Sequence, residues 1–229
     1  MRERARFVFL LDVDNTLLDN DLIEVDLQAH LDQALGAGCR RSYWAIFEKL
    51  RAELGYADYL GALQEYRLQN PRDPDILEMS SFLIDYPFAD RLYPKALEVI
   101  DFLRHFGTAV ILSDGDAVFQ PRKVRRSGIW KAANGRVLIY VHKERMLDDV
   151  EQKYPAEHYI QVDDKVRILA AMKSVWKERL TTVFVRQGHY AIEKGIVERY
   201  VPADLTIESI GDLMRENVLD PVIRKPYKA

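Results

Sequence analysis

The sequence lacks three features, and each absence excludes a class of protein. It has one cysteine, Cys39, so an intrachain disulfide is excluded, which is typical of a reducing compartment. It has no apolar run near the length of a membrane-spanning helix. It also has no excess of positive charge, since the formal net charge is −3 and no basic tail is present. We therefore expect neither a membrane nor a nucleic-acid partner.

The first apolar run of the chain is short. It spans residues 7–11 and stops at Asp12, which is too few residues for the apolar core of a signal peptide, so we expect a cytoplasmic protein. The 229 residues, 48% hydrophobic and 30% charged, suffice for one large domain or for a core with a smaller insert. The sequence leaves open whether the protein is a monomer or a homodimer.

The same run predicts a buried strand that ends in two carboxylates. Residues 7–11 include aromatic and β-branched side chains, as buried strands do, and Asp12 and Asp14 follow directly. Two carboxylates this close are costly to bring together unless a cation or a difference in protonation separates their roles. Because α/β folds place their sites at the carboxyl ends of the strands, this pair is the first candidate for a functional site.

The stretch that follows has helical patterns only. Apolar residues recur every four residues from Ile23 to Leu35, and Gly36 and Gly38 are predicted to end that helix. Three further amphipathic patterns lie before Tyr86. We therefore expect residues 19–92 to form a helical domain that is inserted into the rest of the fold.

After Pro94 the pattern changes to alternating strands and helices. The predicted strands are residues 108–112, 137–141, 159–162, 182–185 and 205–207. Alternation of this kind implies a mostly parallel sheet with helices on both faces. We predict an α/β fold with a three-layer, Rossmann-like core, formed by residues 1–18 and 93–229.

Polar residues follow each of the first four predicted strands. They are Asp12 and Asp14, Ser113-Asp114-Gly115, His142-Lys143, and Asp163-Asp164. Parallel strands end at the same edge of a sheet, so these side chains should converge in one crevice. Such a set suits phosphoryl transfer, because a carboxylate can attack phosphorus and a hard cation such as Mg²⁺ can neutralise the two anions that must meet.

These four motifs resemble, in the same order, those of the haloacid dehalogenase-like (HAD) hydrolase superfamily. Residues 12–16 match the first motif, Ser113 the second, Lys143 the third and Asp163-Asp164 the fourth. The resemblance covers the whole chain, and the helical insert is similar to the superfamily's cap of the first type. It implies a HAD-like Rossmannoid core and a helical cap that closes over the active site.

The resemblance implies roles for the four aspartates. Asp12 would be the nucleophile and a metal ligand. Asp14 would be the general acid and base, and its main-chain carbonyl would also bind the metal. Asp163 would be the main further ligand to Mg²⁺, with Asp164 a ligand or a partner of the ligands; the sequence does not decide which of the two binds directly.

The resemblance also implies how the phosphoryl group is held. Ser113 would donate a hydrogen bond to it, and Lys143 would neutralise its charge and hold Asp12 in line. Main-chain amides would complete the cradle, and the candidates are those of Val13, Asp14, Asp114 and Gly115.

Several other residues are weaker candidates. Lys123 competes with Lys143, but it lies in a basic run, which is more typical of a solvated helix face. His142 and His189 are more typical of structural positions than of a site. The aromatic residues Tyr43, Trp44 and Phe47 are more typical of the core of the insert than of a substrate pocket.

We predict a Mg²⁺-dependent phosphatase that hydrolyses a small phosphorylated metabolite through an aspartyl-phosphate intermediate. A phosphomutase would keep the same pair of carboxylates. A 2-haloacid dehalogenase-like hydrolase would share the fold and Asp12, but it needs neither the carboxylate of Asp14 nor the metal. A catalytically inactive HAD-fold binding protein is the non-enzymatic alternative, against which the complete motif set argues. The sequence of the insert does not identify the substrate.

Overall fold

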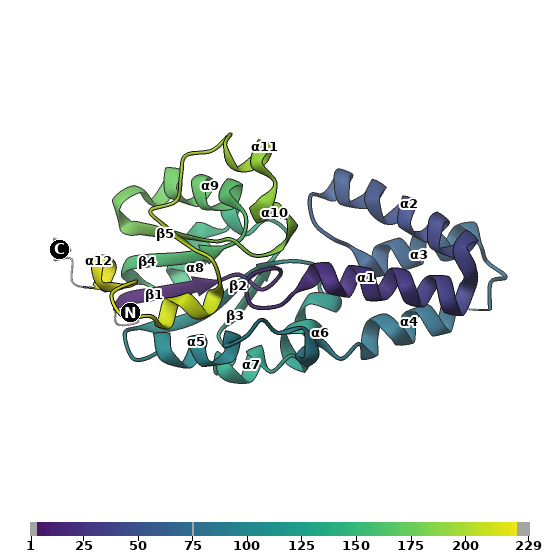
Figure 1. Ribbon diagram of the computed structural model, residues 1–229, viewed down its shortest axis with the longest axis horizontal. Helices are drawn as coiled ribbons and strands as arrows, with labels where there is room; N and C mark the ends of the chain where they lie inside the picture. The colour runs from purple at the N-terminus through teal and green to yellow at the C-terminus, as the bar shows by residue number, and fades with distance from the viewer. Residues whose placement is uncertain (1–3, 75, 224–229) are drawn as a thin grey trace.

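Figure 1 shows the protein as a computed structural model, which describes residues 4–74 and 76–223. Six strands form one sheet in the order β3-β2-β1-β4-β5-β6, and every neighbouring pair is parallel. The strands are β1 (Ala5–Leu11), β2 (Thr108–Asp114), β3 (Val137–Tyr140), β4 (Ala156–Asp163), β5 (Leu180–Val185) and β6 (Leu205–Ile207). The predicted α/β class with a parallel sheet is confirmed.

The central strand β1 separates two apolar clusters. Phe9 and Leu11 belong to the cluster on one face of the sheet, whereas Val8 and Leu10 belong to the cluster on the other. All four side chains are at most 1% exposed. Successive side chains of a strand point to opposite faces, so a strand that is buried on both faces has to be apolar throughout. This is why residues 7–11 form an unbroken apolar run.

Helices cover both faces of the sheet. On the side of Phe9 lie α5 (Ala96–Leu103), α6 (Phe119–Arg126) and α7 (Ile129–Ala132), and on the side of Val8 lie α8 (Leu147–Lys153) and α9 (Val166–Trp176). The remaining short helices are α10 (Gly188–Ile192), α11 (Lys194–Val197) and α12 (Asp220–Ile223). None of the helices in the described part of the chain has the length and apolar character that crossing a membrane would require.

A helical insert extends from one end of the core (Figure 1). Its helices are α1 (Asn20–His30), α2 (Gly36–Leu54), α3 (Tyr59–Gln69) and α4 (Ile76–Asp85), and a π-helical turn over Leu31–Leu35 follows α1. Gly36, with a φ of +84°, ends the first helical run as predicted. Gly38 does not, because it lies within α2.

The two chain segments that connect the insert to the core lie side by side. The amide of Asp19 donates a hydrogen bond to the carbonyl of Arg91 (2.7 Å), and the amide of Tyr93 donates one to the carbonyl of Leu17 (3.0 Å). A second contact joins α4 to α6, since Arg122 forms an ion pair with Asp85 at 3.0 Å. The insert is therefore held both at its connections and along α6.

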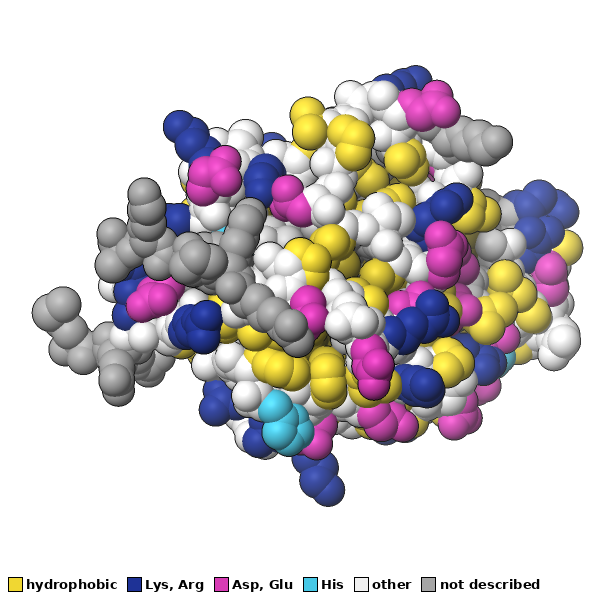
Figure 2. Space-filling model, turned by 60° about the vertical axis from the view of Figure 1, so that its left-hand side comes forward, with side chains coloured by type: hydrophobic (Ala, Val, Ile, Leu, Met, Phe, Trp, Pro, Cys, Tyr) yellow, Lys and Arg dark blue, Asp and Glu magenta, His cyan; other side chains and the backbone are white. Residues whose placement is uncertain are grey.

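The surface carries charges of both signs. On the face shown in Figure 2, Lys and Arg side chains are interspersed with Asp and Glu among the described residues. This face has no continuous basic area of the kind that a nucleic-acid backbone requires. That the protein has no nucleic-acid or membrane partner stays a prediction.

Candidate active site

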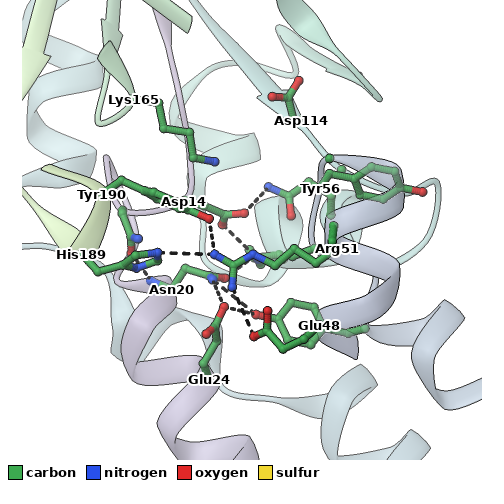
Figure 3. A pocket seen from close by; sticks show the side chains of 18 of the residues that line it. Asp14, Asn20, Glu24, Glu48, Arg51, Tyr56, Asp114, Lys165, His189 and Tyr190 are labelled. Carbon is green, nitrogen blue, oxygen red and sulfur yellow. Dashed lines mark hydrogen bonds and ion pairs between the residues drawn. The ribbon is translucent and has the colours of Figure 1, made fainter. Parts of the chain in front are cut away.

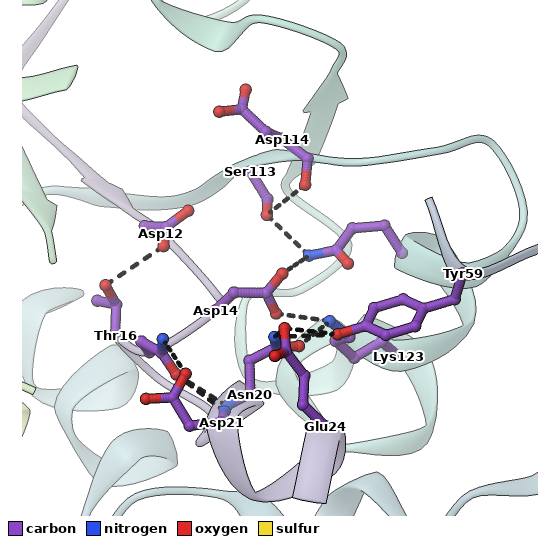
Figure 4. Close-up of polar contacts among 12 residues, drawn as sticks. Asp12, Asp14, Thr16, Asn20, Asp21, Glu24, Tyr59, Ser113, Asp114 and Lys123 are labelled. Atoms are coloured by element: carbon purple, nitrogen blue, oxygen red, sulfur yellow. Dashed lines mark hydrogen bonds and ion pairs between the residues drawn. The ribbon is translucent and has the colours of Figure 1, made fainter. Parts of the chain in front are cut away.

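The register of the sheet brings the predicted motifs to one edge. Leu11 of β1 is aligned with Ile111 of β2 and with Val162 of β4. The residues that follow, Asp12 and the polar ends of β2 and β4, therefore emerge at the same edge. Figure 4 shows the side chains of Asp12, Asp14 and Ser113 near one another.

Lys143 joins two of the buried carboxylates. Its Nζ lies 2.5 Å from Oδ1 of Asp12 and 2.7 Å from Oδ2 of Asp163. Burial raises the pKa of Asp12 to about 7, against the opposing effect of the Lys143 ammonium. Burial alone would lower the pKa of Lys143, but Asp12 and Asp163 hold it well above its usual value. Lys143 therefore remains a cation that fixes one oxygen of Asp12.

Asp164 is a buried carboxylate without a partner. Neither of its oxygens has a hydrogen-bond partner among the described residues, and the side chain is fully buried. Burial raises its pKa well above the usual value. The oxygens of Asp163, in contrast, accept hydrogen bonds from the amide of Lys165 (2.9 Å) and the Gln161 side chain (3.1 Å), in addition to the ion pair with Lys143.

The acidic cluster fits a hard divalent cation. Oxygens of Asp12, Asp163 and Asp164 lie within 4.8 Å of one another. A buried carboxylate without a partner is costly, and oxygen ligands alone are what Mg²⁺ prefers. The sequence favoured Asp163 over Asp164 as the further ligand. The structure instead leaves the Asp164 oxygens free, while those of Asp163 are engaged.

Lys123 is bound to Asp14. Its Nζ lies 2.7 Å from Oδ1 of Asp14 and 2.9 Å from Oδ1 of Asn20, and the side chain is 1% exposed. The interpretation of Lys123 as part of a solvated helix face was wrong, because α6 packs between the core and the insert. The spacing in the sequence could have indicated that Lys123 is buried, because it lies one helical turn after the buried Phe119 and therefore on the same helix face.

The Ser113 hydroxyl is held by a residue that sequence reasoning missed. Nε2 of Gln120 donates hydrogen bonds to Oγ of Ser113 (2.9 Å) and to Oδ2 of Asp14 (3.3 Å). Asp114 has a different partner, because its carboxylate accepts from the amide of Lys143 at 2.7 Å. Burial raises the pKa of Asp114.

Only some of the expected main-chain amides are free to bind an anion. The amide of Gly115 donates to the carbonyl of Tyr140 at 2.9 Å, so we do not include it among the amides available to a phosphate, and its place in the cradle stays a prediction. The amides of Val13 and Asp14 donate no hydrogen bond to any described residue. They lie on the turn directly after β1, where successive free amides can bind an anion.

A cavity of about 330 Å³ lies between the insert and the strand ends (Figure 3). The core contributes Asp14, Asn15, Asp114, Gly115, Gln120, Lys123, Lys165, Arg167, His189 and Tyr190. The insert contributes Asn20, Glu24, Glu48, Arg51, Gly55, Tyr56 and Tyr59, among others. The aromatic residues Tyr43 and Phe47 are fully buried in the core of the insert and do not line the cavity.

Arg51 reaches across the cavity from the insert to the core. It forms a hydrogen bond with the Tyr190 hydroxyl and lies 3.4 Å from Nε2 of His189. His189 in turn contacts Asp21, with Nδ1 2.6 Å from its Oδ1. His189 thus lines the cavity, whereas His142 does not. The sequence contains no local pattern that predicts these contacts.

The loop after β5 approaches the first motif closely. At Gly188, with a φ of +69°, an added Cβ would lie 2.4 Å from Cγ of Asn15. Only glycine allows both this conformation and this approach. Gly188 therefore permits His189 and Tyr190 to lie next to the residues that follow β1.

Comparisons with known proteins agree with this architecture. No protein-family model matches the chain, and no curated protein matches it. A solved structure of a protein named as a haloacid dehalogenase-like hydrolase, from Burkholderia xenovorans, is 62% identical, with a TM-score of 0.89; the match covers 92% of this chain and 98% of that one.

More distant structures share the fold. The HAD hydrolase YfnB of Bacillus subtilis, in a magnesium-bound form, is 17% identical over 92% of this chain and 97% of its own, with a TM-score of 0.58. An L-2-haloacid dehalogenase of Xanthobacter autotrophicus is 18% identical over 90% and 96%, with a TM-score of 0.57. At such low identity these two likenesses support the fold alone.

Proposed function

Since this chain belongs to the haloacid dehalogenase-like hydrolase family, we propose that it is a Mg²⁺-dependent phosphatase that acts on a small phosphorylated metabolite. The observation that carries this proposal is the second carboxylate, Asp14. It lines the cavity and is held by Lys123 and Gln120. A phosphatase needs such a group to protonate the leaving oxygen, whereas a dehalogenase releases a halide that needs no proton.

The first half of the proposed reaction forms a phosphorylated aspartate. Lys143 fixes Oδ1 of Asp12, and Oδ2, which accepts a hydrogen bond from Thr16 at 3.3 Å, is the oxygen available for attack. Oδ2 forms a bond to phosphorus while the ester P–O bond breaks. Asp14 gives its proton to the oxygen that leaves. The free amides of Val13 and Asp14 and the Ser113 hydroxyl supply hydrogen bonds to the phosphoryl oxygens.

The second half restores the enzyme. Asp14, now a carboxylate, takes a proton from a water molecule, and the water oxygen attacks phosphorus. The bond between phosphorus and Oδ2 breaks, which releases inorganic phosphate and regenerates Asp12. The ammonium of Lys123, 2.7 Å from Oδ1 of Asp14, keeps this side chain oriented toward the cavity in both steps.

We assign the metal to Asp12 and Asp164, with Asp163 as the residue that orients Lys143. The main-chain carbonyl of Asp14 remains a proposed further ligand. When bound, Mg²⁺ would neutralise negative charge between the phosphate ester and Asp12. The support for Asp164 is that it is the buried carboxylate with no other partner among the residues described.

The Asp164→Asn variant should lose most of the thermal stabilisation by Mg²⁺. In the wild type, Mg²⁺ at 100 times its Kd should stabilise the folded protein by about 2.7 kcal/mol, because it binds the folded state only. The measurement is the melting temperature with and without Mg²⁺, and Asp148→Asn, on the exposed side of α8, is the matched control. An unchanged Mg²⁺ effect in Asp164→Asn would show that this residue is not a ligand.

The proposed function is tested by the release of phosphate from a panel of phosphorylated metabolites. We expect release with Mg²⁺ and loss of nearly all of it with a chelator. A parallel assay measures halide release from 2-haloacids, which we expect to be negligible. Halide release that a chelator does not affect, together with no phosphate release, would refute the phosphatase and favour a dehalogenase.

A further inference from the structure

A second cavity adjoins the cavity of about 330 Å³ between the insert and the strand ends, which we call the catalytic cavity. The two cavities differ in the charge of the residues that line them. The volume of the second cavity is about 280 Å³. It shares Gly55, Lys165, Arg167 and Tyr190 with the catalytic cavity and adds Arg199 and Tyr200. We call it the side pocket. It lies between the start of α9, the segment after β5 and the C-terminal end of α2, so residues far apart in the sequence form it.

The side pocket is lined by cations without carboxylates. It contains Lys165, Arg167 and Arg199, and none of the described residues that line it is acidic. In the catalytic cavity, by contrast, Lys123 is paired with Asp14 at 2.7 Å and Arg51 with Glu48 at 3.5 Å. The side pocket is therefore lined by more positive than negative charge, although Arg167 forms an ion pair with Glu144, which lies outside the lining, at 2.9 Å.

The three cations have hydrogen-bonding capacity to spare. The ammonium of Lys165 forms no ion pair or hydrogen bond with a described residue, and it lies 4.8 Å from the centroid of the Tyr190 ring. In Figure 3 it points toward the catalytic cavity from the wall that the two cavities share. Arg167 donates through Nη1 to Glu144 at 2.9 Å, which leaves its other nitrogens available. Arg199 is exposed and forms no ion pair within the described part of the chain.

We propose that the side pocket binds a second anionic group of the substrate, a carboxylate or a second phosphate carried by the part that leaves with the ester oxygen. This rests on the proposed phosphatase function. Lys165 lines both cavities, so a substrate whose leaving oxygen lies near Asp14 can extend past it toward Arg167 and Arg199. The rings of Tyr190 and Tyr200 offer apolar surface to the part of the substrate between its two charged ends.

The test compares three aromatic phosphate esters that differ only at the far end of the ring. They are 4-carboxyphenyl phosphate, its uncharged counterpart 4-carbamoylphenyl phosphate, and 1,4-phenylene bisphosphate. A hydrogen bond to a charged group is strong enough to change kcat/KM about tenfold or more. We therefore expect the wild type to prefer at least one of the two esters that carry a second anionic group over the carbamoyl ester by about that factor.

The preference should depend on the arginines of the side pocket. In Arg199→Gln, and more strongly in the double variant with Arg167→Gln, kcat/KM for the preferred ester should fall at least about threefold. In Arg199→Gln the value for the carbamoyl ester should change less than twofold, because Arg199 lines the side pocket and not the catalytic cavity. Arg72→Gln, an exposed arginine on the far part of the insert, is the control and should leave both values unchanged.

The outcomes separate this inference from the proposed function. Equal kcat/KM for the three esters in the wild type would overturn the side pocket while leaving the phosphatase intact, as would a preference that the double variant retains. If none of the three esters is hydrolysed, the metabolite panel still tests the phosphatase, and calorimetric titration with the same esters tests the side pocket. Tighter binding of an ester with a second anionic group, weakened in the double variant, supports the pocket, and equal binding of all three overturns it. Of the two esters with a second anionic group, the one with the higher kcat/KM or the tighter binding identifies that group as carboxylate or phosphate.

Discussion

Replacing Asp12 by asparagine should lower kcat for phosphate-ester hydrolysis by at least about 10⁴-fold. The amide that replaces the carboxylate is too weak a nucleophile to form the covalent intermediate. Asparagine has nearly the same shape as aspartate and can still accept a hydrogen bond from Lys143. The change therefore removes the reacting oxygen with little effect on the surrounding structure.

A stability measurement keeps this result interpretable. Asp12 is one of three clustered carboxylates, and burial raises its pKa to about 7. Removing its charge should leave the melting temperature unchanged or raise it. Loss of activity with an undiminished melting temperature identifies a chemical role, and Asp148→Asn should retain full activity. A folded Asp12→Asn protein that keeps wild-type turnover would refute the assignment of Asp12 as nucleophile.

Replacing Lys143 by methionine should have the largest effect on stability. The Lys143 side chain is 2% exposed, and its Nζ lies 2.5 Å from Asp12 and 2.7 Å from Asp163. Methionine would fill much the same space but would leave two buried carboxylates without their cation. Breaking a buried ion pair in this way costs about 3–5 kcal/mol of unfolding free energy, which urea denaturation measures directly.

The deficit of Lys143→Met should grow as the pH rises. Without the ammonium, the folded-state pKa of Asp12 should rise further above its value in the unfolded chain, so the folded state binds more protons. Stability then falls with increasing pH, and the deficit should be larger at pH 8 than at pH 5.5. Lys153→Met, which removes a partly exposed ion pair with Asp149, is the control and should show a far smaller loss. A deficit of the same size at both pH values would show that packing, and not the buried charges, causes it.

Most of the fold could be predicted from sequence, for a local reason. The apolar run at residues 7–11 is unbroken because both of its faces are buried, and such a pattern is visible without tertiary information. Alternation of strands and helices after Pro94 then implies a parallel sheet. A parallel sheet aligns the carboxyl ends of its strands, which explains why Asp12, Ser113 and Asp163 lie at one edge.

The individual pairings at that edge could not be predicted. Asp163 and Asp164 are neighbours in the chain and have the same side chain, yet one is engaged by Lys143 and the other has no partner among the described residues. Which of two adjacent side chains faces a given cation depends on the local backbone direction after β4. The sequence shows that two carboxylates are present, but it does not predict which of them contacts Lys143.

The positions of the strands along the chain and the four polar motifs follow from local patterns of polarity, so the sequence alone is enough to predict them, whereas the order of the strands in the sheet is a property of the tertiary structure. Lys123 shows where such patterns fail: charge suggested solvent, but packing of α6 between the core and the insert buries its ammonium against Asp14. The side pocket is even less predictable from local patterns, because Gly55, Lys165 and Arg199 come from three distant segments of the chain. Contacts between distant segments are set by how whole elements pack, and no local pattern records them.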